Sequence, residues 1–225
     1  MEEMNGTSII ATLENEFKNK KVLYLVIKRL FDIIVSGISL IILAPVFLLI
    51  GIIIKIDSKG KAIFKQKRIG KNGEPIYIYK FRTMIPNAEE VLEKMLKENP
   101  EVYEEYTRDK KLKNDPRVTK FGNILRKTSL DELPQLLNIF NGDMSIVGPR
   151  PYLYREITDM GEHYNDIIQM TPGLTGLWQV SGRSDVNFTD RCKLDSIYYH
   201  KRGIKKDLEI MFKTFGVVFF KKGAR

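Results

Sequence analysis

The chain has 225 residues and a formal net charge of +9, with 43% hydrophobic and 29% charged residues. This composition is typical of a chain that buries a core, and it excludes general disorder. The positive charge predicts an anionic partner such as an acidic lipid, a nucleic acid or a phosphorylated substrate. A single cysteine, Cys192, excludes an intrachain disulfide and a zinc site built from several cysteines.

The N-terminal part combines a polar and basic leader, residues 1–27, with a strongly apolar stretch. Ile33 to Ile54 is an uncharged run of 22 residues, which is the length of a membrane helix. A helix buried in a protein core is the alternative, but the run is long for one. Basic residues flank both ends of the run, whereas a simple crossing is basic mainly on its cytoplasmic side.

Ala44 and Pro45 lie in the middle of this run. Proline removes a backbone hydrogen bond and kinks or breaks a helix. The twelve residues before Pro45 rise only about 18 Å, which is too short for a hydrocarbon core of about 30 Å. We therefore expect residues 28–58 to form a re-entrant helix that breaks at Pro45 and returns to the cytoplasmic face. Residues 59–225 then form a domain on that face.

The next part of the chain predicts a hairpin followed by acidic helices. Ile63-Phe64 and Ile76 to Tyr79 flank Asn72-Gly73, a favoured turn pair. Seven glutamates between residues 89 and 105 indicate a solvated helical face turned away from an acidic membrane, and Pro100 divides this stretch.

Further helices complete the predicted fold. We expect a short helix from Pro134 to Phe140, a helix from Tyr152 to Gln169 and an apolar helix from Leu208 to Phe220. The last is too short to span a membrane and fits an interfacial helix, although packing against the soluble core is an alternative. The predicted fold class is α+β, a mainly α-helical domain with a small β-hairpin or sheet and the N-terminal re-entrant helix.

Two adjacent carboxylates, Asp131 and Glu132, follow a basic lead-in that contains Arg126. An aspartate can attack phosphorus as a nucleophile, and a neighbouring glutamate can hold a divalent metal that neutralises phosphate oxygens. The alternative is a capping box, since Ser129 and Glu132 have the spacing of one. Arg150, between two prolines, is suited to bidentate phosphate binding, and a solvated arginine in a surface turn is its alternative.

Two later segments have both a functional and a structural interpretation. Pro172 to Arg183 combines three glycines with the only tryptophan, Trp178. Its glycines either allow a ligand to approach the backbone closely or form an ordinary packed turn. Leu194 to Tyr199 is interpreted as the core face of a helix with a buried acid, Asp195, that needs a partner.

These features together resemble the bacterial sugar transferases, the monotopic polyprenyl-phosphate glycosyl-1-phosphate transferases with a single re-entrant membrane segment. The resemblance covers roughly Lys28 to Ala224. It rests on five motifs in order: Lys28-Arg-Leu-Phe-Asp32, Tyr79-Lys80-Phe-Arg82-Thr-Met84, Ser129-Leu-Asp131-Glu132-Leu-Pro-Gln135, Val147-Gly-Pro-Arg150-Pro151, and Pro172-Gly-Leu-Thr-Gly-Leu-Trp-Gln-Val-Ser-Gly-Arg183. One departure is Ala44, where many members have serine before the proline of the membrane break.

The resemblance implies transfer of a sugar 1-phosphate from a UDP-sugar to a polyprenyl phosphate, usually undecaprenyl phosphate. Asp131 matches the aspartate that attacks the sugar-side phosphorus, expels UMP and carries a covalent phosphosugar. Glu132 matches the metal-binding glutamate, Asp131 is implied as a second metal ligand, and the implied cofactor is Mg²⁺ with Mn²⁺ as an option. The candidate substrate-binding and phosphate-binding residues are Arg126, Arg150, Lys80 and Arg82.

The resemblance also implies a location and a set of partners. The expected location is the bacterial plasma (inner) membrane, with residues 59–225 as a mainly α-helical catalytic domain with interfacial helices at the cytoplasmic face. The expected partners are the UDP-sugar, undecaprenyl phosphate and membrane lipids, without nucleic acid, and a homodimer is an option. The product starts exopolysaccharide, capsule, O-antigen or glycan synthesis. The acidic insert of residues 86–113 resembles members that transfer galactose or glucose phosphate.

Two other functions stay open on the sequence alone. A non-enzymatic membrane adaptor of a polysaccharide assembly complex explains the apolar segment and the charge, but it has no use for the carboxylate pair. A membrane-tethered nucleic-acid binder needs aromatic side chains interleaved with basic ones along a groove. The aromatic residues here lie mostly at apolar helix or strand positions.

Overall fold

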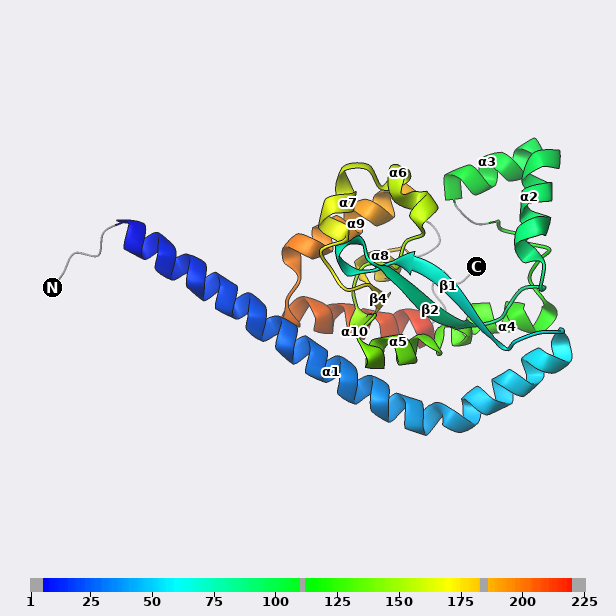
Figure 1. Ribbon diagram of the computed structural model, residues 1–225, viewed down its shortest axis with the longest axis horizontal. Coiled ribbons are helices and arrows are strands. Elements are labelled where there is room, and N and C mark those ends of the chain that lie inside the picture. The colour runs from blue at the N-terminus through cyan, green and yellow to red at the C-terminus, as the bar shows by residue number, and fades with distance from the viewer. Residues whose placement is uncertain (1–5, 110–111, 183–185, 220–225) are drawn as a thin grey trace.

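The computed structural model describes residues 6–109, 112–182 and 186–219. These residues form a mostly helical domain with two small sheets beside one long N-terminal helix (Figure 1). The first elements are α1 (Gly6–Asp57), β1 (Ile63–Ile69), η1 (Lys71–Gly73), β2 (Pro75–Phe81), α2 (Ala88–Glu98), α3 (Pro100–Asp109), α4 (Lys120–Thr128), η2 (Leu130–Glu132) and α5 (Gln135–Asn141). The later elements are β3 (Ser145–Val147), η3 (Tyr154–Glu156), α6 (Ile157–Met160), η4 (Gly161–His163), α7 (Tyr164–Ile167), β4 (Gly173–Thr175), α8 (Leu177–Val180), α9 (Phe188–Lys201) and α10 (Ile204–Phe219).

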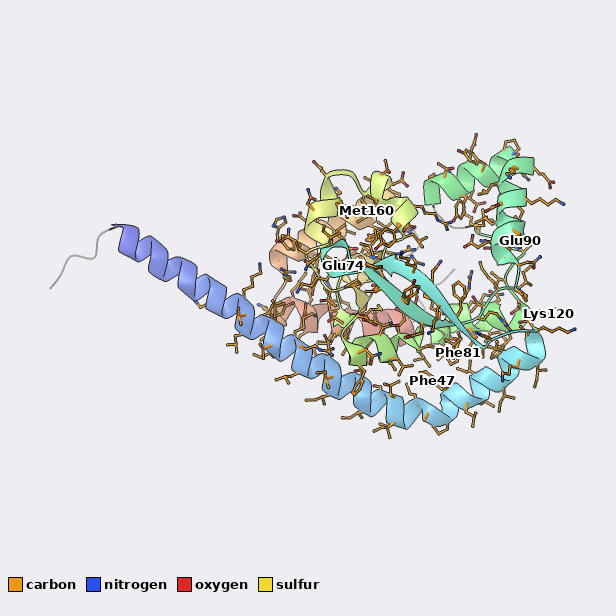
Figure 2. The ribbon with its side chains drawn as sticks, viewed as in Figure 1. Phe47, Glu74, Phe81, Glu90, Lys120 and Met160 are labelled. Carbon is orange, nitrogen blue, oxygen red and sulfur yellow. The ribbon has the colours of Figure 1, made fainter. Side chains whose placement is uncertain are left out.

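The predicted membrane segment lies within α1, and the structure corrects its expected geometry. Helical backbone continues through Ala44 and Pro45, so the expected break into two helices is absent. The helix instead changes direction along its length, and the bend lies near Phe47 (Figures 1 and 2). Proline costs a helix one hydrogen bond, and a bend accommodates this loss without ending the helix. From Gly6 onward the leader belongs to the same helix.

The apolar part of α1 is exposed to a degree that a core helix is not. Among the described residues, Lys20–Asp57 is the one helix whose length and composition are sufficient to cross a membrane, and only 11% of its most apolar window is buried. Ile41 and Ile42 are 77% and 68% exposed. Because such apolar surface is unfavourable in water, the interpretation as a buried core helix does not hold.

One face of the second half of α1 packs against the domain. Ile50 and Ile54 form a core cluster with Phe81 of β2 and Leu125 of α4. Phe47 lies beside Phe81, with ring centroids 5.5 Å apart (Figure 2). The hairpin is therefore fixed directly to the exposed apolar helix.

The predicted hairpin is confirmed. β1 and β2 pair in antiparallel register, with Phe64 opposite Lys80 and Ile69 opposite Pro75. Asn72 in the connection has a positive φ of 59°, a conformation that asparagine tolerates better than most residues. A second sheet consists of β3 and β4, which pair in parallel.

The helical predictions are partly confirmed. Pro100 separates α2 from α3, as expected, and Figure 1 shows α3 on the side of the domain away from the bend of α1. α5 matches the predicted short helix within one residue at each end. The single helix expected from Tyr152 to Gln169 is wrong. This stretch forms four short helical turns, because Gly161, at φ 54° and ψ −137°, ends the helix at Met160.

α10 presents an apolar stripe to its surroundings. Leu208, Phe212 and Phe215 are 42%, 74% and 63% exposed, and they recur at helical spacing. Its opposite face is anchored in the core, where Ile210 is fully buried beside Tyr198 of α9. The helix thus packs against the core on one face and leaves an apolar face free, while Phe220 of the predicted helix lies outside the described residues.

Candidate active site

The two adjacent carboxylates lie in η2, a single 3-10 turn between α4 and α5. α4 ends at Ser129, whose left-handed backbone (φ 58°) redirects the chain into this turn. The Ser129 side chain makes no capping hydrogen bond at the start of η2. Since that bond defines a capping box, the structure does not support the interpretation of Glu132 as a helix-capping residue.

Glu132 faces Lys80 of β2. Lys80 Nζ donates a hydrogen bond to Glu132 Oε1 at 2.6 Å, and the two side chains are 25% and 33% exposed. Successive side chains point to opposite faces of a strand. Phe81 is buried in the core on one face of β2, so its neighbour Lys80 points to the other face, where Glu132 lies. Burial raises the pKa of Glu132, but the positive charges of Lys80, Arg150 and Arg68 outweigh it, so the pKa of Glu132 is lowered. Glu132 is therefore a carboxylate at neutral pH.

Asp131 has a different environment from its neighbour. Its side chain is buried, with 9% of the residue exposed. Burial and the adjacent Glu132 charge raise the pKa of Asp131 to about 6, against the opposing effects of Lys80 and Arg126. A carboxylate with this pKa is mostly ionised at pH 7, yet poorly solvated, which favours its action as a nucleophile.

Arg126 lies in the last turn of α4, next to Asp131. Its Nε donates to Thr83 Oγ1 at 3.0 Å, which fixes the guanidinium beside the dyad. Burial lowers the pKa of Arg126 and the charge of Asp131 raises it, so the two groups are electrostatically linked. Gly122 allows this packing, because a Cβ atom there would lie 2.1 Å from the Thr83 carbonyl oxygen. The predicted grouping of Arg126 with the dyad is present in the structure.

Arg150 reaches the same site from the loop after β3. Its backbone N–H donates to Asp195 Oδ2 at 3.1 Å, and the Tyr152 hydroxyl donates to the same oxygen at 2.9 Å. Asp195 on α9 is fully buried, so it is the buried acid that the sequence predicted, and these are its partners. Burial raises the pKa of Asp195 to about 7. The loop that carries Arg150 is thus fastened to the core by a buried carboxyl group.

Arg68 of β1 is a site residue that the sequence did not single out. It is buried, and its Nη1 donates to the Pro151 carbonyl oxygen at 3.0 Å. Burial and then the charge of Arg150 lower the pKa of Arg68 to about 10, so these two guanidinium groups lie close together. The available signal was its place among the basic residues that follow the apolar run. Arg68 lies beyond the predicted strand residues Ile63-Phe64, and only the observed strand register directs it toward Arg150.

Arg82, a predicted phosphate-binding residue, contacts the end of α1 in this structure. Its Nη2 donates to the Ser58 carbonyl oxygen at 2.6 Å and to Ser58 Oγ at 3.0 Å. These contacts hold the C-terminal end of α1, where a positive charge is favourable. The structure therefore brings together the dyad, Lys80, Arg126 and Arg150, and it places Arg82 at the helix end.

The glycine-rich segment supports the site by packing. A Cβ atom at Gly173 or Gly176 would lie within 2.3 Å of the Gly148 backbone, so these glycines allow two chain segments to approach each other. Arg191 stacks over the Trp178 ring at 5.0 Å. The structural interpretation of this segment therefore fits the described residues, and Arg183 of its motif lies outside them.

The carboxylate oxygens of the dyad are potential ligands for a divalent metal ion. Among the described residues, no group of three or more His, Cys, Asp or Glu side chains is arranged to hold a metal ion. The dyad offers two carboxylates, and Lys80 engages only Oε1 of Glu132. Mg²⁺ is commonly held by one or two carboxylates together with substrate phosphates and water. The donor set thus fits Mg²⁺ or Mn²⁺ that binds together with a diphosphate, and it does not fit a closed protein cage.

Comparison with known proteins places this arrangement in a family. Residues 23–221 match the family model described as bacterial sugar transferase. The chain is 45% identical over 197 residues to the exopolysaccharide production protein ExoY of Sinorhizobium fredii, which covers 88% of the chain and 87% of that protein. It is 44% identical over 198 residues to the undecaprenyl-phosphate galactose phosphotransferase of Salmonella typhimurium, covering 88% of the chain and 41% of that protein.

A third relative is the UDP-glucose:undecaprenyl-phosphate glucose-1-phosphate transferase of Escherichia coli. It is 35% identical over 236 residues, which cover 100% of the chain and 46% of the relative. The chain thus spans less than half the length of several relatives and most of the length of ExoY. The family match covers nearly all of the described structure, and the resemblance inferred from the five motifs is confirmed. The chain belongs to the bacterial sugar transferase family.

Proposed function

We propose that this protein transfers a sugar 1-phosphate from a UDP-sugar to a polyprenyl phosphate at a membrane surface. The observation that carries the proposal is the Asp131–Glu132 dyad, which lies among Lys80, Arg126 and Arg150 and next to an exposed apolar helix. The names of the relatives from S. typhimurium and E. coli describe this reaction for galactose and glucose. The name of ExoY suggests exopolysaccharide synthesis as the pathway.

In the first half-reaction, an Asp131 carboxylate oxygen attacks the sugar-side phosphorus of the UDP-sugar. A new bond forms between this oxygen and phosphorus, and the bond from that phosphorus to the bridging oxygen breaks. The electron pair leaves with UMP, and a phosphosugar remains on Asp131 as a mixed anhydride. The pKa of about 6 leaves Asp131 ionised at neutral pH, as the attack requires.

In the second half-reaction, a phosphate oxygen of the polyprenyl phosphate attacks the same phosphorus. The bond between phosphorus and Asp131 breaks, the carboxylate is restored and the polyprenyl diphosphate sugar is released. One site thus serves the UDP-sugar donor and the polyprenyl phosphate acceptor in turn, because the covalent intermediate separates the two half-reactions. Ping-pong kinetics are the expected consequence.

The cationic side chains supply charge stabilisation in this scheme. Phosphoryl transfer depends mainly on positioning and on neutralisation of the phosphate oxygens. Lys80 keeps Glu132 ionised, while Arg126 and Arg150 flank the position of the phosphates. Asp131 and Glu132 would hold Mg²⁺ together with the diphosphate, and the ion would neutralise charge there when bound.

Membrane attachment follows from the chemistry of the two substrates. A polyprenyl phosphate cannot leave the bilayer, and a UDP-sugar cannot enter it, so the dyad must lie at the boundary. The exposed face of α1 and its bend near Phe47 support a re-entrant helix that holds the domain at the cytoplasmic face of the plasma membrane. The apolar stripe on α10 suits contact with the same surface.

The proposal is tested by release of UMP from the full chain in detergent with Mg²⁺ and undecaprenyl phosphate. UDP-galactose and UDP-glucose are the first donors, followed by other UDP-sugars. Asp131→Asn is expected to lose nearly all turnover, and Glu132→Gln most of it. Glu90→Gln, an exposed acid on α2, is the matched control. A folded Asp131→Asn variant with normal UMP release would refute the role of Asp131 as the nucleophile. A folded wild-type chain that releases no UMP with any donor would refute the transferase reaction and favour an adaptor role.

A further inference from the structure

A cavity of about 230 Å³ lies between the first half of α1 and the surface formed by β3 and the junction of α9 with α10. It is separate from the dyad. Lys71, which lines the cavity, belongs to the turn of the hairpin, whereas Lys80 is near the other end of β2. Figure 2 shows Glu74 and Phe81 at opposite ends of this strand.

The cavity lining is strongly positive. It includes four cations, Lys28, Arg29, Lys71 and Arg202, and one carboxylate, Asp32. Lys28 pairs with Asp207 at 2.7 Å outside this set, which leaves an excess of positive charge around the cavity. Such an excess in a confined space favours an anion.

Two of these cations are free to bind a ligand. Among the residues that the structure describes, neither Lys71 nor Arg202 forms an ion pair with a carboxylate, and Arg202 stacks over the Tyr199 ring at 4.6 Å. Arg29 is already fixed, because it donates to the carbonyl oxygens of Ile139 and Phe140 at 2.6 and 2.8 Å. Arg29 contributes charge, while Lys71 and Arg202 can contribute hydrogen bonds.

A buried hydroxyl in the lining supports the same conclusion. Ser145 is 2% exposed and lines the cavity, and its hydroxyl faces the Asp32 carboxylate without forming a hydrogen bond of normal geometry. A buried polar group without a partner is unfavourable unless a ligand or water satisfies it. The nearby Asp32 carboxylate accepts a hydrogen bond from the backbone N–H of Ile146 at 2.9 Å. This bond occupies Oδ1 of Asp32, which reduces the repulsion between the carboxylate and a bound anion.

The position of the cavity points to an amphiphilic ligand. Leu25 lines it together with Lys28 and Arg29 on the same face of α1. The adjacent helix positions Val22 and Val26 are 54% and 51% exposed, so an apolar surface runs beside the cationic one. A phosphate group in the cavity would therefore leave an attached acyl chain along the apolar surface of the helix.

We propose that this cavity is a second phosphate-binding site, separate from the Asp131–Glu132 dyad. Its ligand is a phosphate-bearing group, with a lipid headgroup as the favoured source and a soluble phosphate as the alternative. Lys71, Arg202 and the Ser145 hydroxyl provide the hydrogen bonds, and Arg29 adds its charge. The inference does not depend on the proposed transferase reaction.

The test measures binding of a fluorescent short-chain phosphatidylglycerol to the full chain in nonionic detergent, by anisotropy. Lys71→Gln/Arg202→Gln is compared with Lys120→Gln/Lys201→Gln, which removes the same charge from exposed positions outside the cavity. The first variant should bind at least about tenfold more weakly, since hydrogen bonds to charged groups are lost, and the second should resemble wild type. Equal affinity of the two double variants would overturn the proposal.

Two further measurements show whether the phosphate comes from a lipid headgroup and whether the cavity is separate from the catalytic site. Displacement of the probe by unlabelled phosphatidylglycerol, but not by inorganic phosphate at millimolar concentration, assigns the site to a lipid headgroup. Displacement by both assigns it to the phosphate group alone. UMP release by Lys71→Gln/Arg202→Gln, in detergent with undecaprenyl phosphate but without added phospholipid, should equal that of wild type. Loss of this activity would show that the cavity belongs to the catalytic site, and it would contradict the claim of a separate site.

Discussion

Replacing Lys80 with methionine tests how the dyad is ionised. The side chain keeps its length in Lys80→Met but loses the ammonium group that donates to Glu132 Oε1 at 2.6 Å. The same ammonium opposes the burial that raises the pKa of Asp131 to about 6. Its removal should therefore raise the pKa of both carboxyl groups, and Asp131 should require a higher pH to act as a nucleophile.

The size of the effect follows from the geometry of the ion pair. Two unit charges about 4 Å apart interact by about 4 kcal/mol at an effective dielectric constant of about 20. Because the Lys80 and Glu132 side chains are 25% and 33% exposed, solvent screening reduces this to about 1–2 kcal/mol. That free energy corresponds to about one pKa unit. A loss of this size raises the pKa of Glu132. Because the Lys80 charge also lowers the pKa of Asp131, the acid limb of the pH profile, near pH 6 in wild type, should move to higher pH.

The assay is the pH dependence of kcat/KM for UMP release between pH 5 and 8.5. Lys80→Arg, which keeps the charge, should leave the acid limb near its wild-type position. Lys65→Met is the matched control, because Lys65 lies on the paired strand and stacks over the Tyr79 ring at 5.1 Å without contacting the dyad. An unchanged acid limb in Lys80→Met would refute the assignment of Lys80 as the group that holds the dyad ionised.

Three further predictions concern the supports of the site. Burial raises the pKa of Asp195 to about 7, so this group makes wild type less stable as pH rises from about 4 to 7, and Asp195→Asn should flatten that part of a thermal stability profile. Gly122→Ala places a methyl group 2.1 Å from the Thr83 carbonyl oxygen and should cost about 2–3 kcal/mol, measured as a Tm several degrees lower. Phe212→Ser, at a side chain 74% exposed on α10, should weaken binding to anionic vesicles by about tenfold.

Each of these predictions has a control. A Cβ atom at Gly203 would meet nothing within 4 Å, so Gly203→Ala should leave Tm nearly unchanged. Tyr103→Ser removes an aromatic ring that is 55% exposed on the acidic helix α3, and it should leave vesicle binding intact. Equal losses in Phe212→Ser and Tyr103→Ser would contradict contact of α10 with the membrane. A pH dependence of stability that persists in Asp195→Asn would assign that dependence to other groups.

The features that the sequence predicted correctly are those encoded by local patterns. The hairpin was predicted from Asn72-Gly73 because this pair accepts the positive φ that the turn requires. Pro100 separates two helices because it fits the first turn of a helix but not its interior. The dyad and Arg150 were recognised from short motifs, since adjacent acids and an arginine between prolines are contiguous in the chain.

The features that the sequence did not predict depend on contacts between distant segments. α1 continues through Pro45 because Ile50 and Ile54 pack onto the hairpin and α4, which outweighs one lost helix bond. Arg68 lies on a hairpin strand and Arg82 lies next to one. The strand register places Arg68 beside Arg150, and the position of α1 places Arg82 at the end of that helix.

The most direct test of the central claim is the intact mass of the full chain after incubation with Mg²⁺ and a UDP-sugar that supports UMP release, without a polyprenyl phosphate. The account predicts an added mass of one phosphosugar, located on Asp131 by peptide mapping, and its loss when undecaprenyl phosphate is added. The Asp131→Asn variant should gain no mass under the same conditions. An adduct on another residue, or turnover of that donor without any adduct on Asp131, would contradict the account.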